Sequence, residues 1–179
     1  MSDAQQRVVL VDAQDNPLRE MEKIAAHSEG VLHRAFSVFV VRERAGEPEL
    51  LLQLRAAGKY HFGGLWTNTC CGHPQLGETP VDAGLRRLPE EMNFTCPLRA
   101  IGSFIYRARS SNGLIEHELD HVLLGRWGGE PPAPNPAEAD AARFIAFSSL
   151  DRELAAQPDR FTPWFAQGYA LVKAELAQK

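Results

Sequence analysis

Three histidines and two glutamates stand at positions that could together hold a divalent metal ion. His27, His33 and His73 are spread over the first half of the chain, and Glu116 and Glu118 follow two residues apart. If residues 116 and 118 lie on a strand, their side chains share one face, and adjacent carboxylates repel each other unless a cation or a proton lies between them. Imidazole and carboxylate ligands suit Mn²⁺, Zn²⁺ or Mg²⁺, and the residue types do not select among these ions. The alternatives are ordinary polar histidines and a solvent-facing edge for the two glutamates.

Two adjacent cysteines, Cys70 and Cys71, precede His73 and offer a second kind of chemistry. A thiol with a pKa of about 8.5 can transfer a proton at neutral pH when cations lie beside it. Consecutive side chains on an extended segment point to opposite faces, so at most one of these thiols faces a given pocket. Taken alone, each would be a small buried side chain, as we expect for Cys96.

A third group of candidate residues lies between Gly72 and residue 94. Gly72 is followed after five residues by Glu78, and after seven more by Arg86-Arg87-Leu88-Pro89-Glu90-Glu91. A Thr-Pro-x-Asp start predicts a helix over residues 80–92, with the apolar stripe Val81, Leu85, Leu88 and Met92. At about 100° per residue, Glu91 faces inward beside this stripe and Glu90 faces solvent. Several carboxylates on one loop and helix could together bind a divalent cation such as Mg²⁺.

The elements that must position these side chains are predicted from hydrophobic periodicity and turn signals. We expect strands over residues 7–11, 36–41, 50–54, 104–108, 114–125 and 144–147, with a hairpin loop over 42–49. Residues 18–26 are expected to form a short strand or an ordered approach to His27. A C-terminal helix is expected over 161–176, and a proline-rich loop over 130–136. Because Pro89 lacks an amide hydrogen, we expect a kink or an early loosening at this residue in the helix over 80–92.

The spacing over residues 72–94 resembles the Nudix box, although Arg87 stands where that box has glutamate and Asn93 where it has glycine. Replacing a metal-binding acid with a cation argues against hydrolysis. The segment Asn68-Thr69-Cys70-Cys71-Gly72-His73-Pro74, with the later Glu116-His117-Glu118, resembles the type 1 isopentenyl diphosphate isomerases of the Nudix superfamily. Further matches lie over residues 26–27, 32–37, 106–108 and 161–164, so the resemblance covers nearly the whole chain.

This resemblance implies an α+β fold, a Nudix-type α/β/α sandwich with a mixed central sheet. It implies an enzyme that interconverts isopentenyl diphosphate and dimethylallyl diphosphate in isoprenoid biosynthesis. It also implies that one divalent ion (Mn²⁺, Zn²⁺ or Mg²⁺) is held by all five residues His27, His33, His73, Glu116 and Glu118. A second ion, Mg²⁺ carried by the substrate diphosphate, is expected near Glu91.

The same resemblance implies roles for the remaining candidate residues. Cys71 rather than Cys70 forms the acid–base pair with Glu118 across the substrate, and Tyr106 assists Glu118 through a hydrogen bond. Trp164 offers a π face to a carbocation. The cations expected to hold the diphosphate are Lys23, Arg55, Lys59 and Arg87, each of which would singly be an ordinary surface charge.

Length and composition bound the remaining possibilities. The chain of 179 residues has a net charge of −4 and 44% hydrophobic residues, which favours a single domain over residues 1–179 with a real core. An acidic chain is a poor match for nucleic acid, and from its apolar patterning we expect neither a signal peptide nor membrane insertion. We expect a cytoplasmic monomer, with a weak dimer as the alternative. Two other functions stay open: a Nudix hydrolase of a nucleoside or other diphosphate, and a catalytically inactive binding module.

Overall fold

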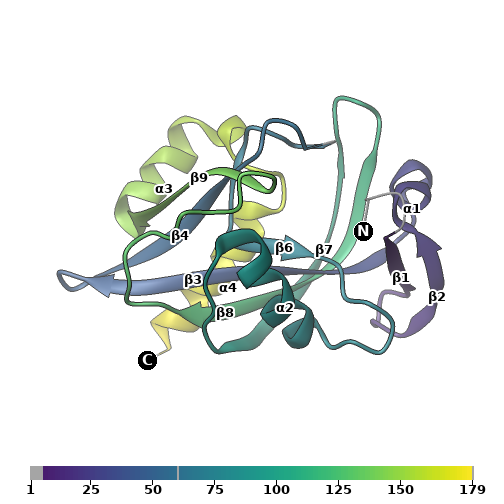
Figure 1. Ribbon diagram of the computed structural model, residues 1–179, viewed down its shortest axis with the longest axis horizontal. Coiled ribbons are helices and arrows are strands. Elements are labelled where there is room, and N and C mark those ends of the chain that lie inside the picture. The colour runs from purple at the N-terminus through teal and green to yellow at the C-terminus, as the bar shows by residue number, and fades with distance from the viewer. Residues whose placement is uncertain (1–5, 60, 179) are drawn as a thin grey trace.

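A nine-stranded sheet forms the centre of the computed structural model, which describes residues 6–59 and 61–178 (Figure 1). The strands are β1 (Arg7–Val11), β2 (Pro17–Glu22), β3 (His33–Arg44), β4 (Glu47–Arg55), β5 (Trp66–Thr67), β6 (Cys70–Gly72), β7 (Leu98–Arg109), β8 (Ile115–Arg126) and β9 (Ala139–Ala146). The helices are α1 (Lys23–Glu29), α2 (Pro80–Met92), α3 (Phe147–Ala156) and α4 (Phe165–Ala177), and a short 3₁₀ turn covers Pro158–Arg160.

Strand β3 is the hub of this sheet. It pairs antiparallel with β1, β4 and β6, and parallel with β8, so the sheet is mixed. The register sets Ser37 opposite Cys71 on β6 and His33 opposite Glu118 on β8. Strand β3 therefore brings the cysteine segment on β6 and the glutamate segment on β8 next to each other.

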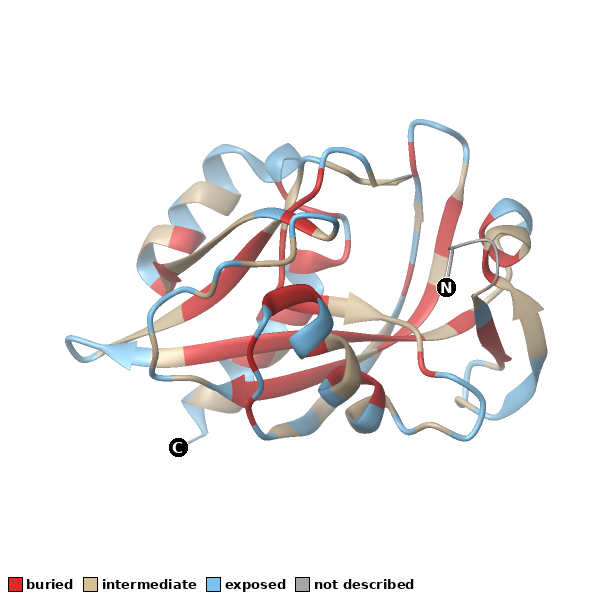
Figure 2. Cartoon of the chain, viewed as in Figure 1, coloured by how far each residue is buried: buried red, intermediate tan, exposed pale blue. Residues whose placement is uncertain are grey.

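Helices cover both faces of the sheet. Successive side chains of β3 point to opposite faces, and apolar residues on both faces are buried by helices. Phe39 and Val41 belong to one buried cluster with residues of α3 and α4, whereas Phe36, Val38 and Val40 belong to another with residues of α2. Figure 1 shows α2 and α4 on opposite sides of the sheet, and Figure 2 shows the buried residues concentrated along its central strands. The predicted sandwich with a mixed central sheet is confirmed.

Helix α2 has the predicted bounds and the predicted start. The Thr79 hydroxyl accepts a hydrogen bond from the Asp82 amide, and Pro80 occupies the first turn. The expected loosening of the helix at Pro89 is wrong, since the helix continues through Met92 and the Asn93 amide donates to the Pro89 carbonyl at 3.1 Å. Asn93 has a φ of 57°, the left-handed conformation in which glycine and asparagine commonly end helices, so it replaces the glycine of the Nudix box without loss of the cap.

The buried stripe of α2 differs from the prediction. Its buried residues include Ala83, Gly84, Leu88 and Met92, whereas Leu85 is 38% exposed. Gly84 lies so close to the sheet that an added Cβ would stand 2.7 Å from Cδ1 of Leu123. The closest approach of the helix therefore runs along its small residues rather than along Leu85.

Several strand and helix boundaries also differ from the prediction. Residues 18–26 are divided between β2 and α1, so His27 lies on a helix. The hairpin loop expected over 42–49 consists only of Ala45 and Gly46. Both residues have a positive φ, as a two-residue hairpin turn requires. Residue 147 begins α3, and the C-terminal helix begins at Phe165. Within the described ranges, no helix combines the length and the apolar character that crossing a bilayer would require.

Candidate active site

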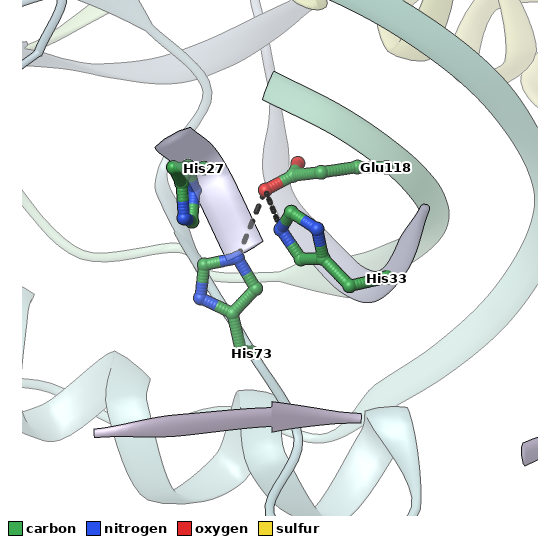
Figure 3. Close-up of side chains that lie close together, drawn as sticks. All are labelled: His27, His33, His73 and Glu118. Atoms are coloured by element: carbon green, nitrogen blue, oxygen red, sulfur yellow. Dashed lines mark hydrogen bonds and ion pairs between the residues drawn. The ribbon is translucent and has the colours of Figure 1, made fainter. Parts of the chain in front are cut away.

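A cluster of potential metal ligands lies where α1, β3, β8 and the turn after β6 meet. The side chains of His27, His33, His73 and Glu118 converge there, and each offers a ligand atom within 4.8 Å of the others (Figure 3). Nε2 of His73 lies 2.9 Å from Oε1 of Glu118, and Nε2 of His33 lies 3.4 Å from the same oxygen. The structure thus brings together four of the five residues expected to bind the resident ion.

Local structure explains how these side chains reach one place. The parallel register of β3 and β8 sets His33 directly beside Glu118, and His73 follows the short strand β6. The Glu22 carboxylate caps α1 by accepting hydrogen bonds from the amides of residues 24 and 25. At the other end of α1, Gly30 has a φ of 66°, which favours glycine and lets the chain turn into β3. His27 is therefore held on a helix capped at both ends.

The hydrogen bonds of two histidines show that the cluster fits a cation. Nδ1 of His27 and Nδ1 of His33 lie 2.6 and 2.9 Å from main-chain carbonyl oxygens, which only accept, so each Nδ1 carries the hydrogen. In a neutral ring Nε2 then carries no hydrogen and can only accept a hydrogen bond. Nevertheless, Nε2 of His27 lies 3.1 Å from Oε2 of Glu116, and Nε2 of His33 lies 3.4 Å from Oε1 of Glu118. Two acceptors face each other stably only around a proton or a metal ion. Nε2 of His33 is buried and makes no hydrogen bond within the described residues, as expected of a metal ligand.

Burial and the contacts between histidines and glutamates act in opposite directions on the pKa values of this site. Burial alone would raise the pKa of Glu118, but its contacts with His33 and His73 lower it well below its ordinary value. Burial lowers the pKa of His73 to about 4 in spite of Glu118. Burial also opposes the charged form of His27, yet its hydrogen bond with Glu116 raises its pKa. The pKa of Glu116 is lowered although burial and Glu118 both act to raise it, because its contacts with His27 and His61 outweigh them.

Glu116 forms a second half of the cluster with a histidine that the sequence reasoning missed. His27, His61 and Glu116 offer ligand atoms within 4.8 Å of one another, and Nε2 of His61 is paired with Oε1 of Glu116. The chain has six histidines, and four of them lie in this cluster. His61 belongs to no motif or periodic pattern, so only its place in the fold connects it to the others.

The two adjacent cysteines point to opposite sides, as predicted. Cys70 is fully buried in the cluster of β3 and α2, whereas Cys71 is partly exposed and lines a cavity of about 1040 Å³. Burial raises the pKa of the Cys71 thiol to about 12, although Arg55, whose Nη1 lies 3.6 Å from Sγ, acts in the opposite direction. Cys71 is therefore a protonated thiol at neutral pH, facing the cavity.

Aromatic side chains line the cavity beside Glu118. The Tyr106 hydroxyl donates a hydrogen bond of 2.6 Å to Oε2 of Glu118, the oxygen that faces away from His33 and His73, and burial raises the pKa of Tyr106 well above its ordinary value. The Trp164 ring lies 5.8 Å from the Tyr106 ring, and its indole nitrogen donates to Asn68. This wall offers a π face next to a protonated phenol.

All four predicted diphosphate-binding cations line the same cavity, namely Lys23, Arg55, Lys59 and Arg87. Two of them already contact a carboxylate that the sequence reasoning did not identify. Glu138 is paired with Nζ of Lys59, and its Oε1 lies 3.3 Å from Nη2 of Arg87. Glu138 follows the proline-rich loop, and no spacing relates it to these cations. Its carboxylate balances part of the charge of Lys59 and Arg87.

Glu91 faces inward and Glu90 is exposed, as predicted. Arg87 donates a hydrogen bond of 2.8 Å to Oε1 of Glu91, and Gln53 donates one of 3.0 Å to Oε2. Burial opposes the charged form of Arg87, but Glu91 and Glu138 outweigh it and raise the pKa of Arg87 above its ordinary value. Glu91 thus lies on the cavity wall, hydrogen-bonded to the cation that replaces a glutamate of the Nudix box.

Similar proteins of known structure share this fold. The DR0079 protein of Deinococcus radiodurans superposes with a TM-score of 0.64 at 21% sequence identity, covering 85% of this chain and 90% of that one. The NUDIX domain of NrtR from Shewanella oneidensis superposes with a TM-score of 0.62 at 14% identity, covering 81% of this chain and 87% of that one.

Sequence comparison identifies much nearer relatives. An isopentenyl-diphosphate Delta-isomerase of Burkholderia multivorans is 52% identical over 161 residues, which cover 90% of this chain and 89% of that one. One from Photobacterium profundum is 48% identical over 177 residues, which cover 98% of each chain. Residues 31–165 match the NUDIX domain family. With its fold and its nearly full-length relatives in agreement, this chain belongs to the isopentenyl-diphosphate Delta-isomerase family of NUDIX proteins.

Proposed function

We propose that this protein interconverts isopentenyl diphosphate and dimethylallyl diphosphate, as the names of its relatives indicate. The observation that supports this most directly is that a cavity of about 1040 Å³ is lined by Cys71, Tyr106 and Glu118 together with the four cations. The cavity thus combines proton-transfer groups with positive charge for a diphosphate. A hydrolase would need the acid that Arg87 replaces.

We assign the diphosphate end of the substrate to the cations. Lys23, Arg55, Lys59 and Arg87 can donate charge-assisted hydrogen bonds to phosphate oxygens. The diphosphate would displace Glu138 from Lys59 and Arg87, exchanging one anion for another of higher charge. We place the Mg²⁺ carried by the substrate beside Glu91.

We assign the reacting alkene to the space between Cys71 and Glu118. Protonation of its terminal carbon gives a tertiary carbocation at the neighbouring carbon, and loss of a proton from the other side completes the double-bond shift. Because the reaction is reversible, each group donates in one direction and accepts in the other. Tyr106 stabilises Glu118 by donating to Oε2, and the Trp164 ring stabilises the cation by about 1–2 kcal/mol in a site shielded from water.

The resident divalent ion is proposed to bind His27, His33, His73, Glu116 and Glu118. When bound, it neutralises the two carboxylates and fixes the orientation of Glu118, whose Oε2 stays on Tyr106. The excess of imidazole donors favours Zn²⁺ or Mn²⁺ in this site and leaves Mg²⁺ to the diphosphate.

We also propose a cytoplasmic monomer. Cys70, Cys71 and Cys96 are all free, and a thiol that transfers protons is preserved by a reducing compartment. Light scattering after size exclusion measures the mass, which should equal that of one chain of 19.8 kDa.

The test is to incubate the purified protein with isopentenyl diphosphate and Mg²⁺ in D₂O. We expect dimethylallyl diphosphate carrying deuterium, detected by mass spectrometry, with no release of phosphate. A nucleoside diphosphate assayed in parallel serves as the hydrolase substrate. Phosphate release from either compound without any alkene isomerisation would overturn the proposal in favour of a Nudix hydrolase.

A further inference from the structure

His61 lies inside the ligand cluster although the five-residue set does not include it. It belongs to the segment between β4 and β5, and its side chain is only 10% exposed. Its Nε2 is paired with Oε1 of Glu116, and its ring centroid lies 5.6 Å from that of His27. The imidazole of His61 therefore extends from a surface segment to a buried carboxylate.

The backbone around His61 is tightly constrained. Its carbonyl accepts a hydrogen bond of 3.3 Å from Nη2 of Arg55. Phe62 has a φ of 50°, a left-handed conformation that side chains with a Cβ disfavour, and its ring packs edge-on against Trp164 at 5.7 Å. An added Cβ on Gly63 would stand 2.8 Å from the Ala57 carbonyl oxygen, so this close turn requires glycine. A disfavoured conformation held by such contacts is typical of functional segments.

With His61 included, the cluster contains two imidazoles for each of its two carboxylates. Glu118 lies beside His33 and His73, and Glu116 lies beside His27 and His61. Each carboxylate is therefore flanked by two imidazoles. The full set offers six donor groups, the number that a six-coordinate divalent ion takes, whereas the five-residue set leaves one position for another ligand.

We propose that His61 is a sixth protein ligand of the resident ion and binds it through Nε2. The proposal rests on the metal site named under the proposed function, but not on the reaction. Since His61 lies between Lys59 and Phe62, its coordination also fixes the segment that carries one diphosphate-binding cation and one aromatic contact of Trp164. Metal binding and the conformation around His61 are thereby linked.

Metal binding by the substrate-free protein tests the proposal without any isomerase assay. Wild type, His61→Ala and His61→Gln are titrated with Co²⁺ and Zn²⁺ against a chelator of known affinity, and bound metal is counted by mass spectrometry. We expect one ion per chain in wild type and an affinity at least about tenfold lower in both variants, because even groups that only support a ligand change affinity by that factor. The Co²⁺ absorption bands should intensify in the variants as coordination falls from six to five, and added imidazole should reverse the change in His61→Ala.

His121→Gln is the matched control, since His121 pairs with Asp15 outside the cluster. It should bind Co²⁺ with wild-type affinity and spectrum. Thermal unfolding of each metal-free variant separates lost coordination from lost folding, and His61→Gln remains informative if the alanine variant unfolds.

Hydrogen exchange measures the proposed link to the segment. In wild type, metal should slow exchange of the Lys59 and Gly64 amides, which donate to the carbonyls of residues 56 and 55. This slowing should disappear in His61→Ala. Unchanged affinity, spectrum and exchange in a folded His61 variant would overturn the proposal, and two ions per wild-type chain would overturn the single six-coordinate centre. An inactive protein with the expected metal behaviour would refute only the isomerase assignment.

Discussion

Replacing Cys71 and Cys70 one at a time by alanine should separate catalysis from packing. The two residues are adjacent on β6, so both changes remove one sulfur from the same strand. Only Cys71 lines the cavity, and only Cys70 belongs to the buried cluster between β3 and α2. Cys71→Ala should therefore lower turnover with little effect on stability, and Cys70→Ala should do the reverse.

The expected magnitudes follow from these two environments. Loss of a positioned acid or base lowers turnover by about 10²–10⁴-fold, which corresponds to about 3–5 kcal/mol in the activation free energy. Cys70 is completely inaccessible to solvent, so removing its sulfur leaves a small cavity and should cost about 1 kcal/mol of unfolding free energy. In a chain of this size that cost lowers Tm by about 2–4 °C. Cys71→Ser should also have low turnover, because a hydroxyl is a far poorer acid than a thiol.

The assay measures kcat with isopentenyl diphosphate at saturating Mg²⁺, together with melting curves of both alanine variants. Bound metal is counted in each sample, so that a loss of the ion is not mistaken for a loss of the thiol. Near-normal turnover in Cys71→Ala, with a collapse in Cys70→Ala at unchanged Tm, would refute the reasoning.

Three further predictions concern packing, pH and the diphosphate. Gly168→Ala should lower Tm, because the new Cβ would stand 2.6 Å from Cζ of the buried Phe39 and such overpacking costs about 1–3 kcal/mol, more than the helix propensity gained; an unchanged or higher Tm would contradict this. Hydrogen bonds from Arg86 lower the pKa of Glu78, so their stabilisation is present above the unfolded pKa of about 4.3 and is lost as the pH falls through the folded value. The free energy of unfolding of Glu78→Gln, measured in urea, should therefore be up to about 1 kcal/mol below that of wild type at pH 6 and equal to it at pH 3. An equal difference at both pH values would contradict this prediction. Arg87→Glu should raise KM for the diphosphate without creating nucleotide hydrolysis, whereas brisk phosphate release would support the hydrolase alternative.

Much of the candidate site could be predicted because its residues lie in short, recognisable segments. Glu116 and Glu118 are two residues apart on a strand, and His73 follows the cysteine pair directly. His61 could not be predicted in this way. Its position depends on contacts of the segment after β4 with Arg55 and Trp164, and on the meeting of that segment with β8.

Helix α3 shows the same limit in the fold. Residues 144–147 are apolar and predict a strand, yet Phe147 is the first residue of the helix. The preceding Ala146 has no side chain that could cap it. The amide of Ser148 instead donates to Oε1 of Glu47, at the start of β4. The signal that begins this helix lies about a hundred residues away in sequence, where no local pattern could reveal it.

The parallel pairing of β3 with β8 also has a consequence for how long each molecule lasts. It joins strands separated by β4, β5, β6, α2 and β7, and such long-range contacts form slowly during folding. His33 and Glu118 come into register only through this pairing, so the proposed ion could not assist the early steps. Its binding energy would then be expressed mainly as slower unfolding. In a cell short of the metal, newly made chains would still fold at their usual rate, but each would open more often and reach a protease sooner. Metal supply would thus set the lifetime of the protein rather than the yield of its synthesis.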